Sequence, residues 1–243
     1  MARGLRLHLK SHQNLKIMKF TYYGHSCFSV FAGGKHLLFD PFITPNELAK
    51  SIDINEIAAD YIFVSHGHFD HVFDVVQIAK RTGAMVLGNW EIYDWFNKQG
   101  LTNTHPINPG GKFSFDFGTV KCVTAVHSSS MPDGSYGGVA SGYVFKTVDG
   151  NFYYSGDTGL TLDMQLIAKW TELDFAVLPI GDGLTMGVED AIEAARYAGA
   201  KKVVGVHYDT FGFIKIDHDQ AILDFADAGL SLYLPGIGNV IDL

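Results

Sequence analysis

The chain has 243 residues, of which 47% are apolar and 18% are charged. This length and composition are those of a globular protein with a substantial core, and they exclude a largely disordered chain. The formal net charge of −8 disfavours a sequence-independent grip on the phosphate backbone of nucleic acid.

The first 17 residues differ from the rest of the chain because they carry four basic residues and no acidic one. They lack the apolar core and the small-residue cleavage site of a secretory signal. Strand-like patterning begins at Met18. We therefore expect residues 1–17 to be a disordered N-terminal arm, or the product of a start assigned upstream of Met18. Residues 18–243 are expected to form a single domain.

Short strand-like runs alternate with helical patterns along the rest of the chain. The first third is mainly strand and hairpin, with a turn at Gly33-Gly34. Strands are expected at residues 37–40, 61–65, 121–126, 151–155, 174–180 and 202–206. Helices are expected at residues 71–83, 161–170, 187–199 and 217–229. The pattern predicts a mixed α/β (α+β) fold.

A histidine or an aspartate follows each of the six predicted strands. These residues are, in chain order, Asp40, His66, His127, Asp157, Asp182 and His207. The carboxyl ends of parallel strands are where α/β sheets gather their ligands. A single histidine after a strand is usually a surface residue, but its recurrence at six strands predicts that one edge of the fold carries the chemistry.

The densest cluster is the segment SHGHFDH, residues 65–71. In an extended segment the side chains of His66 and His68 point the same way, and Asp70 and His71 begin the following helix. Imidazole nitrogens and carboxylate oxygens are ligands of zinc and related divalent cations. The cluster therefore predicts a metal site. Its alternative is a hydrophilic loop in which Asp70 caps the helix.

The pattern H-x-H-x-D-H after an apolar strand resembles the signature of the metallo-β-lactamase superfamily. The segments AVHSSS, SGDTG and GVHYDTF match its downstream ligand positions in order. From Thr21 to Leu234 the chain is similar to small bacterial metal-dependent hydrolases related to L-ascorbate-6-phosphate lactonases. The closer similarity lies in GHSCF, FDPFIT, HSSSMPDGSYGG and LPIGDGLTMG. The resemblance implies a four-layer αββα sandwich with its site at one edge of two sheets.

The resemblance also implies two divalent metal ions, with zinc as the default and manganese, iron or nickel as alternatives. The ligands it implies are His66, His68 and His127 for the first ion, Asp70, His71 and His207 for the second, and Asp157 as the bridge. Two divalent cations would be nearly balanced by the two carboxylates and a hydroxide. A small, anionic substrate would suit such a site.

Metal ions lower the pKa of bound water from about 15.7 to about 7, which makes hydroxide available at neutral pH. Asp70 is the candidate to orient this hydroxide and accept its proton, and Asp157 is the candidate to fix the metal spacing. The sequence thus predicts hydrolysis of an ester, lactone, amide or phosphodiester bond. The alternatives are a nuclease or phosphodiesterase acting on nucleic acid, and a non-catalytic metal-binding or sensing protein.

Four further residues are candidates for supporting roles. Asp40 and Asp182 could each accept a hydrogen bond from the free ring nitrogen of a ligand histidine, although both also fit turn-initiating aspartates. His25 is expected either to line the pocket or to pack as a structural histidine. Ser128, on the loop after His127, is a candidate to contact the substrate.

The two cysteines, Cys27 and Cys122, each lie within an apolar strand-like stretch. We expect buried structural thiols rather than a disulfide or metal ligands, which fits a reducing compartment such as the cytoplasm. No apolar run is long enough to span a bilayer, so no membrane partner is expected. The sequence gives no indication of the oligomeric state.

Overall fold

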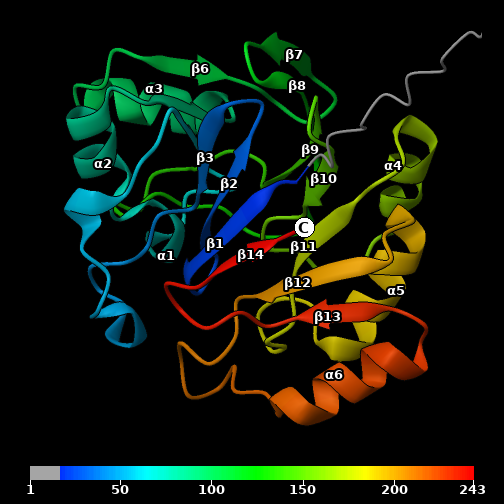
Figure 1. Ribbon diagram of the computed structural model, residues 1–243. Helices are drawn as coiled ribbons and strands as arrows, with labels where there is room; N and C mark the ends of the chain where they lie inside the picture. Colours follow the sequence, from blue (N-terminus) through cyan, green and yellow to red (C-terminus); the bar gives the residue numbers. More distant parts are fainter. Residues whose placement is uncertain (1–16) are drawn as a thin grey trace, which may run out of the picture.

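The computed structural model describes residues 17–243, so the predicted N-terminal arm lies outside the described residues except for Ile17. Two seven-stranded sheets stack on one another with helices on their outer faces (Figure 1). The first sheet has the order β14 (Val240–Asp242), β1 (Lys19–Gly24), β2 (Cys27–Ala32), β3 (Lys35–Phe39), β4 (Tyr61–Phe63), β5 (Met85–Gly88) and β6 (Thr104–Pro106).

The second sheet repeats this plan with a different part of the chain. Its order is β13 (Ser231–Tyr233), β12 (Lys202–Val206), β11 (Phe175–Pro179), β10 (Asn151–Tyr154), β9 (Ser141–Thr147), β8 (Gly118–Thr124) and β7 (Lys112–Phe115). In each sheet one part is parallel, namely β3 to β6 and β10 to β13, and the remaining neighbours are antiparallel.

The helices cover the outer faces of the two sheets. Apolar residues of α2 (Val75–Thr82) and α3 (Trp90–Lys98) pack against the first sheet. Helices α4 (Gln165–Trp170), α5 (Val188–Ala198) and α6 (His218–Asp227) lie along the second sheet (Figure 1). The remaining helical turns are α1 (Phe69–Val72), η1 (Glu47–Ala49), η2 (Ile54–Glu56) and η3 (Leu162–Met164). Within residues 17–243 no helix is long and apolar enough to cross a membrane.

The predicted elements are present, with differences at two helices. The pattern at 71–83 predicts one helix, but the structure has α1 and α2 with a break at Asp74. The N–H of Asp74 donates to the carbonyl of Pro41, and its carboxylate accepts from the N–H groups of Ile43 and Thr44. These bonds fix the loop after β3 and interrupt the helix. The helix expected at 161–170 begins with the 3-10 turn η3.

Aromatic side chains fill the space between the sheets. The Phe39 ring stacks on Phe28 and Phe63, with centroid distances of 4.4 and 5.4 Å. It also meets Phe145 and Phe152 of the second sheet edge-on, at 5.4 and 6.0 Å. All five rings are fully buried. Because Phe39 is the last residue of β3, this cluster holds both sheets together directly behind the edge where Asp40 begins.

Both cysteines are buried and free, as the sequence predicts. Cys27 begins β2 and Cys122 lies within β8, so each thiol is part of a sheet. Burial raises the pKa of both thiols, that of Cys122 to about 12. They therefore remain protonated at neutral pH and serve as small apolar side chains in the core.

Replacing Phe39 tests the aromatic contact between the sheets. We expect Phe39→Ala to lower the free energy of unfolding by about 3–5 kcal/mol, because it leaves a cavity bordered by rings of both sheets. The measurement is equilibrium unfolding in urea. Phe31→Ala on β2 is the control, since its ring is 37% exposed and the loss should stay below about 1.5 kcal/mol. Equal losses in both variants would contradict this account of the core.

Candidate metal centre

The six strands that end in a predicted aspartate or histidine run toward one edge of the molecule. In the first sheet β3 and β4 are parallel, and in the second sheet β10, β11 and β12 are parallel. Strand β8 runs with them because it is antiparallel to β9, which is antiparallel to β10. The two sheets thus deliver their strand ends to a shared edge.

Three histidines form the first donor group at this edge. His66 and His68 follow β4, and His127 follows β8. One ring nitrogen from each lies within 4.8 Å of the others. The Nε2 of His66 is 2.9 Å from the Nδ1 of His68. These three residues are the ones that the sequence assigns to the first metal ion.

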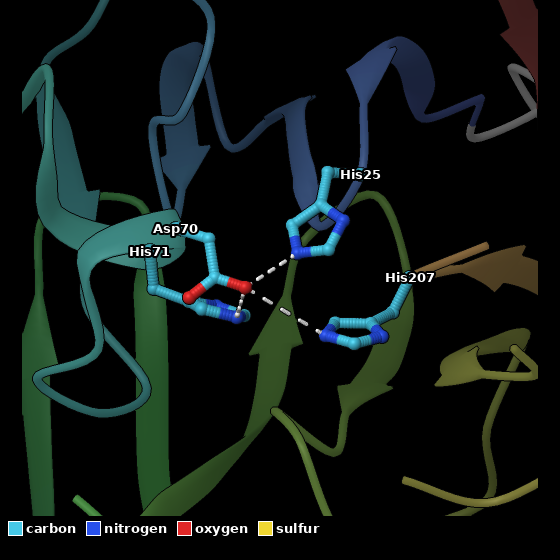
Figure 2. A group of neighbouring side chains, drawn as sticks. All are labelled: His25, Asp70, His71 and His207. Carbon is cyan, nitrogen blue, oxygen red and sulfur yellow. Dashed lines mark hydrogen bonds and ion pairs between the residues drawn. The ribbon is translucent and has the colours of Figure 1, made fainter. Parts of the chain in front are cut away.

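The second donor group contains the three residues predicted for the second ion together with His25 (Figure 2). The Asp70 Oδ2 atom is 3.9 Å from His71 Nε2 and 4.0 Å from His207 Nε2. It is also 2.9 Å from His25 Nε2. Figure 2 shows the carboxylate of Asp70 directed toward all three rings. The donors come from the β1–β2 turn, α1 and the end of β12.

The carboxylate of Asp157 lies between the two groups. Its Oδ2 atom is 2.9 Å from His207 Nε2 and 3.2 Å from His71 Nε2, both in the second group. The same atom is 3.8 Å from His127 Nε2, which belongs to the first group. One carboxylate oxygen within reach of donors from both groups is the arrangement expected of a bridging ligand.

The centre is closed on its inner side and open on its outer side. The side chains of His66 and His71 are fully buried, and those of Asp157 and His207 nearly so. By contrast, the Asp70 side chain is 20% exposed and that of His127 is 14% exposed. His68 is also partly exposed. These three side chains are therefore the part of the centre that solvent reaches.

The protonation of His66 and Asp70 suits cation binding, whereas at His71 the carboxylates of Asp157, Asp40 and Asp70 outweigh burial and raise the pKa well above its usual range. Burial, helped by the neighbouring His71, lowers the pKa of His66 well below its usual range, so its ring is neutral. Burial alone would raise the pKa of Asp70, but His71 and His25 outweigh it and hold that pKa well below its usual range. A neutral imidazole and an ionised carboxylate are the ligand forms of these side chains.

Three buried polar atoms of the donor residues lack a hydrogen-bond partner within residues 17–243. They are His71 Nε2, Asp157 Oδ1 and His207 Nδ1. A buried polar atom without a partner destabilises a protein by about 1–3 kcal/mol, so such atoms mark sites where a ligand completes the structure. Together with the converging nitrogen and oxygen donors, they fit a divalent first-row metal ion.

Asp40 lies on the buried side of the centre and orients one histidine of each donor group through hydrogen bonds. Its fully buried carboxylate accepts a 2.8 Å hydrogen bond from His71 Nδ1. It also accepts from the hydroxyl of Ser65, and that hydroxyl lies 2.9 Å from His66 Nδ1. The Nδ1–H groups of both histidines are thereby directed inward. Their Nε2 atoms are left to face the centre, which is how carboxylates orient metal-binding histidines.

Asp182, the other aspartate considered for this role, is placed differently. It is exposed, and its carboxylate accepts a hydrogen bond from the N–H of Gly183. No hydrogen bond joins it to a histidine in the part of the chain that the structure describes. This geometry corresponds to the turn-initiating aspartate that the sequence offered as the alternative.

His25 is buried at the centre and does not pack as a purely structural histidine. Its Nε2 is bonded to Asp70, and its Nδ1 lies 3.0 Å from the hydroxyl of Thr210. Its carbonyl accepts a hydrogen bond from the N–H of His207 in the other sheet. Burial and the nearby His207 lower the pKa of His25 to about 4. The residue thus holds Asp70 from the side opposite His71.

The loop after His127 carries Ser128, the predicted substrate contact. Its hydroxyl is 3.4 Å from His68 Nε2, at the exposed side of the first donor group. The hydroxyl of the next residue, Ser129, makes hydrogen bonds within the loop region: it donates to the carbonyl of Gly137 and accepts from the N–H of Gly67. Of the two hydroxyls, that of Ser128 is the one placed beside a donor of the centre.

Sequence reasoning missed several supporting residues. Tyr154 donates a 2.6 Å hydrogen bond to Asp40, and Thr210 contacts His25. Also unexpected is a left-handed backbone at five non-glycine residues, which are His25, Asp40, Asp182, His207 and Asp209. Aspartate and histidine tolerate this conformation better than most residues do. Their placement directly after strands is a signal that could have suggested sharp turns there.

Residues 35–208 match the model of the beta-lactamase superfamily domain. A UPF0173 metal-dependent hydrolase of Flavobacterium johnsoniae is 51% identical over 226 residues, which cover 93% of this chain and all of that protein. One from Shouchella clausii is 45% identical over 231 residues, again covering 93% of this chain and all of that protein.

Among solved structures, a metallo hydrolase from the archaeon Ignicoccus hospitalis matches with a TM-score of 0.85 and 31% identity. The match covers 93% of this chain and 98% of that protein. An isothiocyanate hydrolase from Delia radicum gut bacteria matches with a TM-score of 0.74 and 18% identity, covering 92% and 98%. At that identity the second likeness concerns the fold alone.

The two strand-end aspartates give a matched pair of variants. We expect Asp40→Asn to weaken metal binding about 10–100-fold, because an amide cannot accept every hydrogen bond that converges on this carboxylate. Asp182→Asn should leave metal affinity unchanged. The measurement is competition with a chromophoric chelator, with circular dichroism to verify folding. Equal affinities in folded Asp40→Asn and the unmodified protein would rule out the orienting role.

Proposed function

Because the chain belongs to the beta-lactamase superfamily, within its UPF0173 metal-dependent hydrolases, we propose that it hydrolyses a small molecule at a centre of two divalent metal ions. The fold is the αββα metallo-β-lactamase fold, and the protein is an enzyme. The observation that carries the binuclear proposal is the position of Asp157, whose Oδ2 lies within 3.8 Å of ring nitrogens from both donor groups.

The proposed ligand set follows the two groups. The first ion would be held by His66, His68 and His127, the second by Asp70, His71 and His207, and both by Asp157. Zinc is the default metal for this mixture of imidazoles and carboxylates, and manganese, iron or nickel accept the same ligands. Seven ligands for two ions leave room for water, whereas structural zinc sites close all four positions with protein ligands. This difference favours an enzyme over a metal sensor.

When bound, two divalent cations lower the pKa of water to about 7 and polarise the bond that is to be cleaved. The residues of the chain then position the reactants. Asp70 lies at the open side of the centre, where its ionised carboxylate can orient the attacking water and accept its proton. His25 holds that carboxylate in place through the 2.9 Å hydrogen bond to Oδ2. Asp157 fixes the spacing of the two donor groups.

The bond cleaved is proposed to be an ester, lactone, amide or phosphodiester of a small substrate. The balance of charge favours a reacting group that is anionic or becomes so during the reaction. A nuclease is the weaker alternative, since the net charge of −8 opposes binding of nucleic acid. The two free, buried thiols support the cytoplasm as the compartment, and the shared core supports one domain over residues 18–243.

Removing one proposed ligand of the first ion and the proposed bridging ligand tests this proposal. We expect His68→Ala to lose the first metal ion and Asp157→Ala to lose stoichiometric binding of both. Each should reduce kcat/KM on chromogenic ester, lactone and phosphodiester substrates at least about 100-fold. The measurements are metal content by elemental analysis and hydrolysis rates of the metal-loaded proteins.

His36→Ala, a histidine on β3 away from the centre, is the control and should retain metal and activity. The proposal fails if the unmodified protein binds no stoichiometric metal. It also fails if every activity survives both ligand substitutions.

A further inference from the structure

Within residues 17–243, the segments that form the edge around the candidate metal centre contain no lysine or arginine. The edge is formed by residues 24–26, 40–44, 65–73, 125–139, 155–161, 180–187 and 207–214. None of these segments includes a lysine or an arginine. Enzymes that bind phosphates or carboxylates usually grip them with such side chains, because charge-assisted hydrogen bonds are the strong ones.

Lys215 comes directly after the last segment and lines a hollow beside acidic residues, which are Asp182 of the edge and Glu189, Asp190 and Asp224 of α5 and α6. Arg81 donates to the backbone of the loop that contains η2. Acidic residues, in contrast, do occur at the edge, including Asp182 and Asp209. The surroundings of the centre are therefore neutral to acidic.

Aromatic side chains, rather than lysine or arginine, lie beside the second donor group. We call Phe42, Phe69, Phe73, Phe211 and Phe213 the aromatic rim. Phe69 contacts Phe73 and Phe42, with ring centroids 5.1 and 5.5 Å apart. The rings of Phe42 and Phe211 lie 5.6 and 5.4 Å from that of His25, and Phe211 stacks on Phe213 at 5.7 Å. The rim thus adjoins the second donor group through His25.

Phe42 is buried beneath the rim, but the other rings of the rim are open to solvent although they are apolar. Phe69 is 47% exposed, Phe73 46% and Phe213 68%. Phe69 also lies between two donors of the centre in sequence, His68 and Asp70. Large exposed rings grouped beside an active centre mark a binding surface for an apolar ligand.

We propose that the substrate is uncharged outside its reacting group and carries an aromatic or other apolar group that packs on the aromatic rim. This inference rests on the proposed hydrolase function and narrows its substrate class. An anionic group placed on the rim, away from the metal ions, would lose water and gain no lysine or arginine partner from these segments, which is unfavourable. An apolar group would instead cover exposed rings. On this proposal, sugar phosphates and nucleic acids are poor substrates.

The first test uses inhibitors that share a metal-binding group and differ in their tails. Phenylacetohydroxamic acid offers an aromatic tail, and succinohydroxamic acid offers a carboxylate. We expect the zinc-loaded protein to bind the aromatic compound at least about tenfold more tightly, as measured by calorimetry, with zinc content checked afterwards. Equal affinity, tighter binding of the carboxylate compound, or no binding of either would overturn the proposal.

The second test assigns the preference to the aromatic rim. Phe69→Ala and Phe213→Ala should each weaken binding of the aromatic hydroxamate about three- to tenfold and leave the carboxylate compound unchanged. Phe113→Ala on β7, whose ring is 43% exposed, is the matched control and should change neither. Equal effects of both rim variants on both compounds would show that the rim does not select the tail.

A kinetic comparison separates failure of this inference from failure of the proposed function. The two substrates are p-nitrophenyl phenylacetate and the p-nitrophenyl monoester of succinate, which have the same leaving group. Preference for the phenylacetate by about tenfold in kcat/KM supports both proposals. If both esters are cleaved equally, the hydrolase function stands and the substrate class fails. If neither is cleaved but the aromatic hydroxamate still binds preferentially, the binding preference stands and ester hydrolysis fails.

Discussion

The buried carboxylate of Asp40 accepts hydrogen bonds from four donors, and these donors come from both sheets and from the metal centre. The backbone N–H and hydroxyl of Ser65 belong to the segment after β4, and the hydroxyl of Tyr154 belongs to β10 of the second sheet. The fourth donor is His71 in α1. A carboxylate with this many donors cannot move without breaking bonds in each layer. The positions of His66 and His71 therefore depend on correct packing of the two sheets.

The alternation of strand and helix patterns predicted a mixed α/β fold, and the resemblance to a known superfamily implied its four layers. The recurrence of Asp and His after strands predicted the edge that carries the donors, because this pattern does not depend on tertiary detail. It could not distinguish Asp40 from Asp182, since both follow an apolar strand. The difference arises from what packs over each position: a strand of the other sheet brings Tyr154 to Asp40, whereas Asp182 lies in an exposed turn. Such pairings across sheets leave no local pattern in the chain.

Most donors of the centre lie at strand ends fixed by the cores of both sheets, and Asp70 and His71 lie on α1. The residues of the proposed aromatic rim lie on the same helix and on loops. Loop residues can change without disturbing the ligand geometry. On the proposal above, substitutions in the loops of the rim would change the substrate and leave the donors in place.

His25, Asp40 and His207 have a left-handed backbone, which glycine would adopt more easily. At each of these positions the chain instead carries a side chain that belongs to the centre or contacts it. Each such residue costs about 1–2 kcal/mol of local conformational energy relative to an ordinary turn. Glycine at these positions would relieve the backbone but remove the imidazole or carboxylate. These residues therefore lower the free energy of unfolding of the metal-free protein in exchange for side chains that serve the centre. Metal bound to the folded state would raise that free energy again.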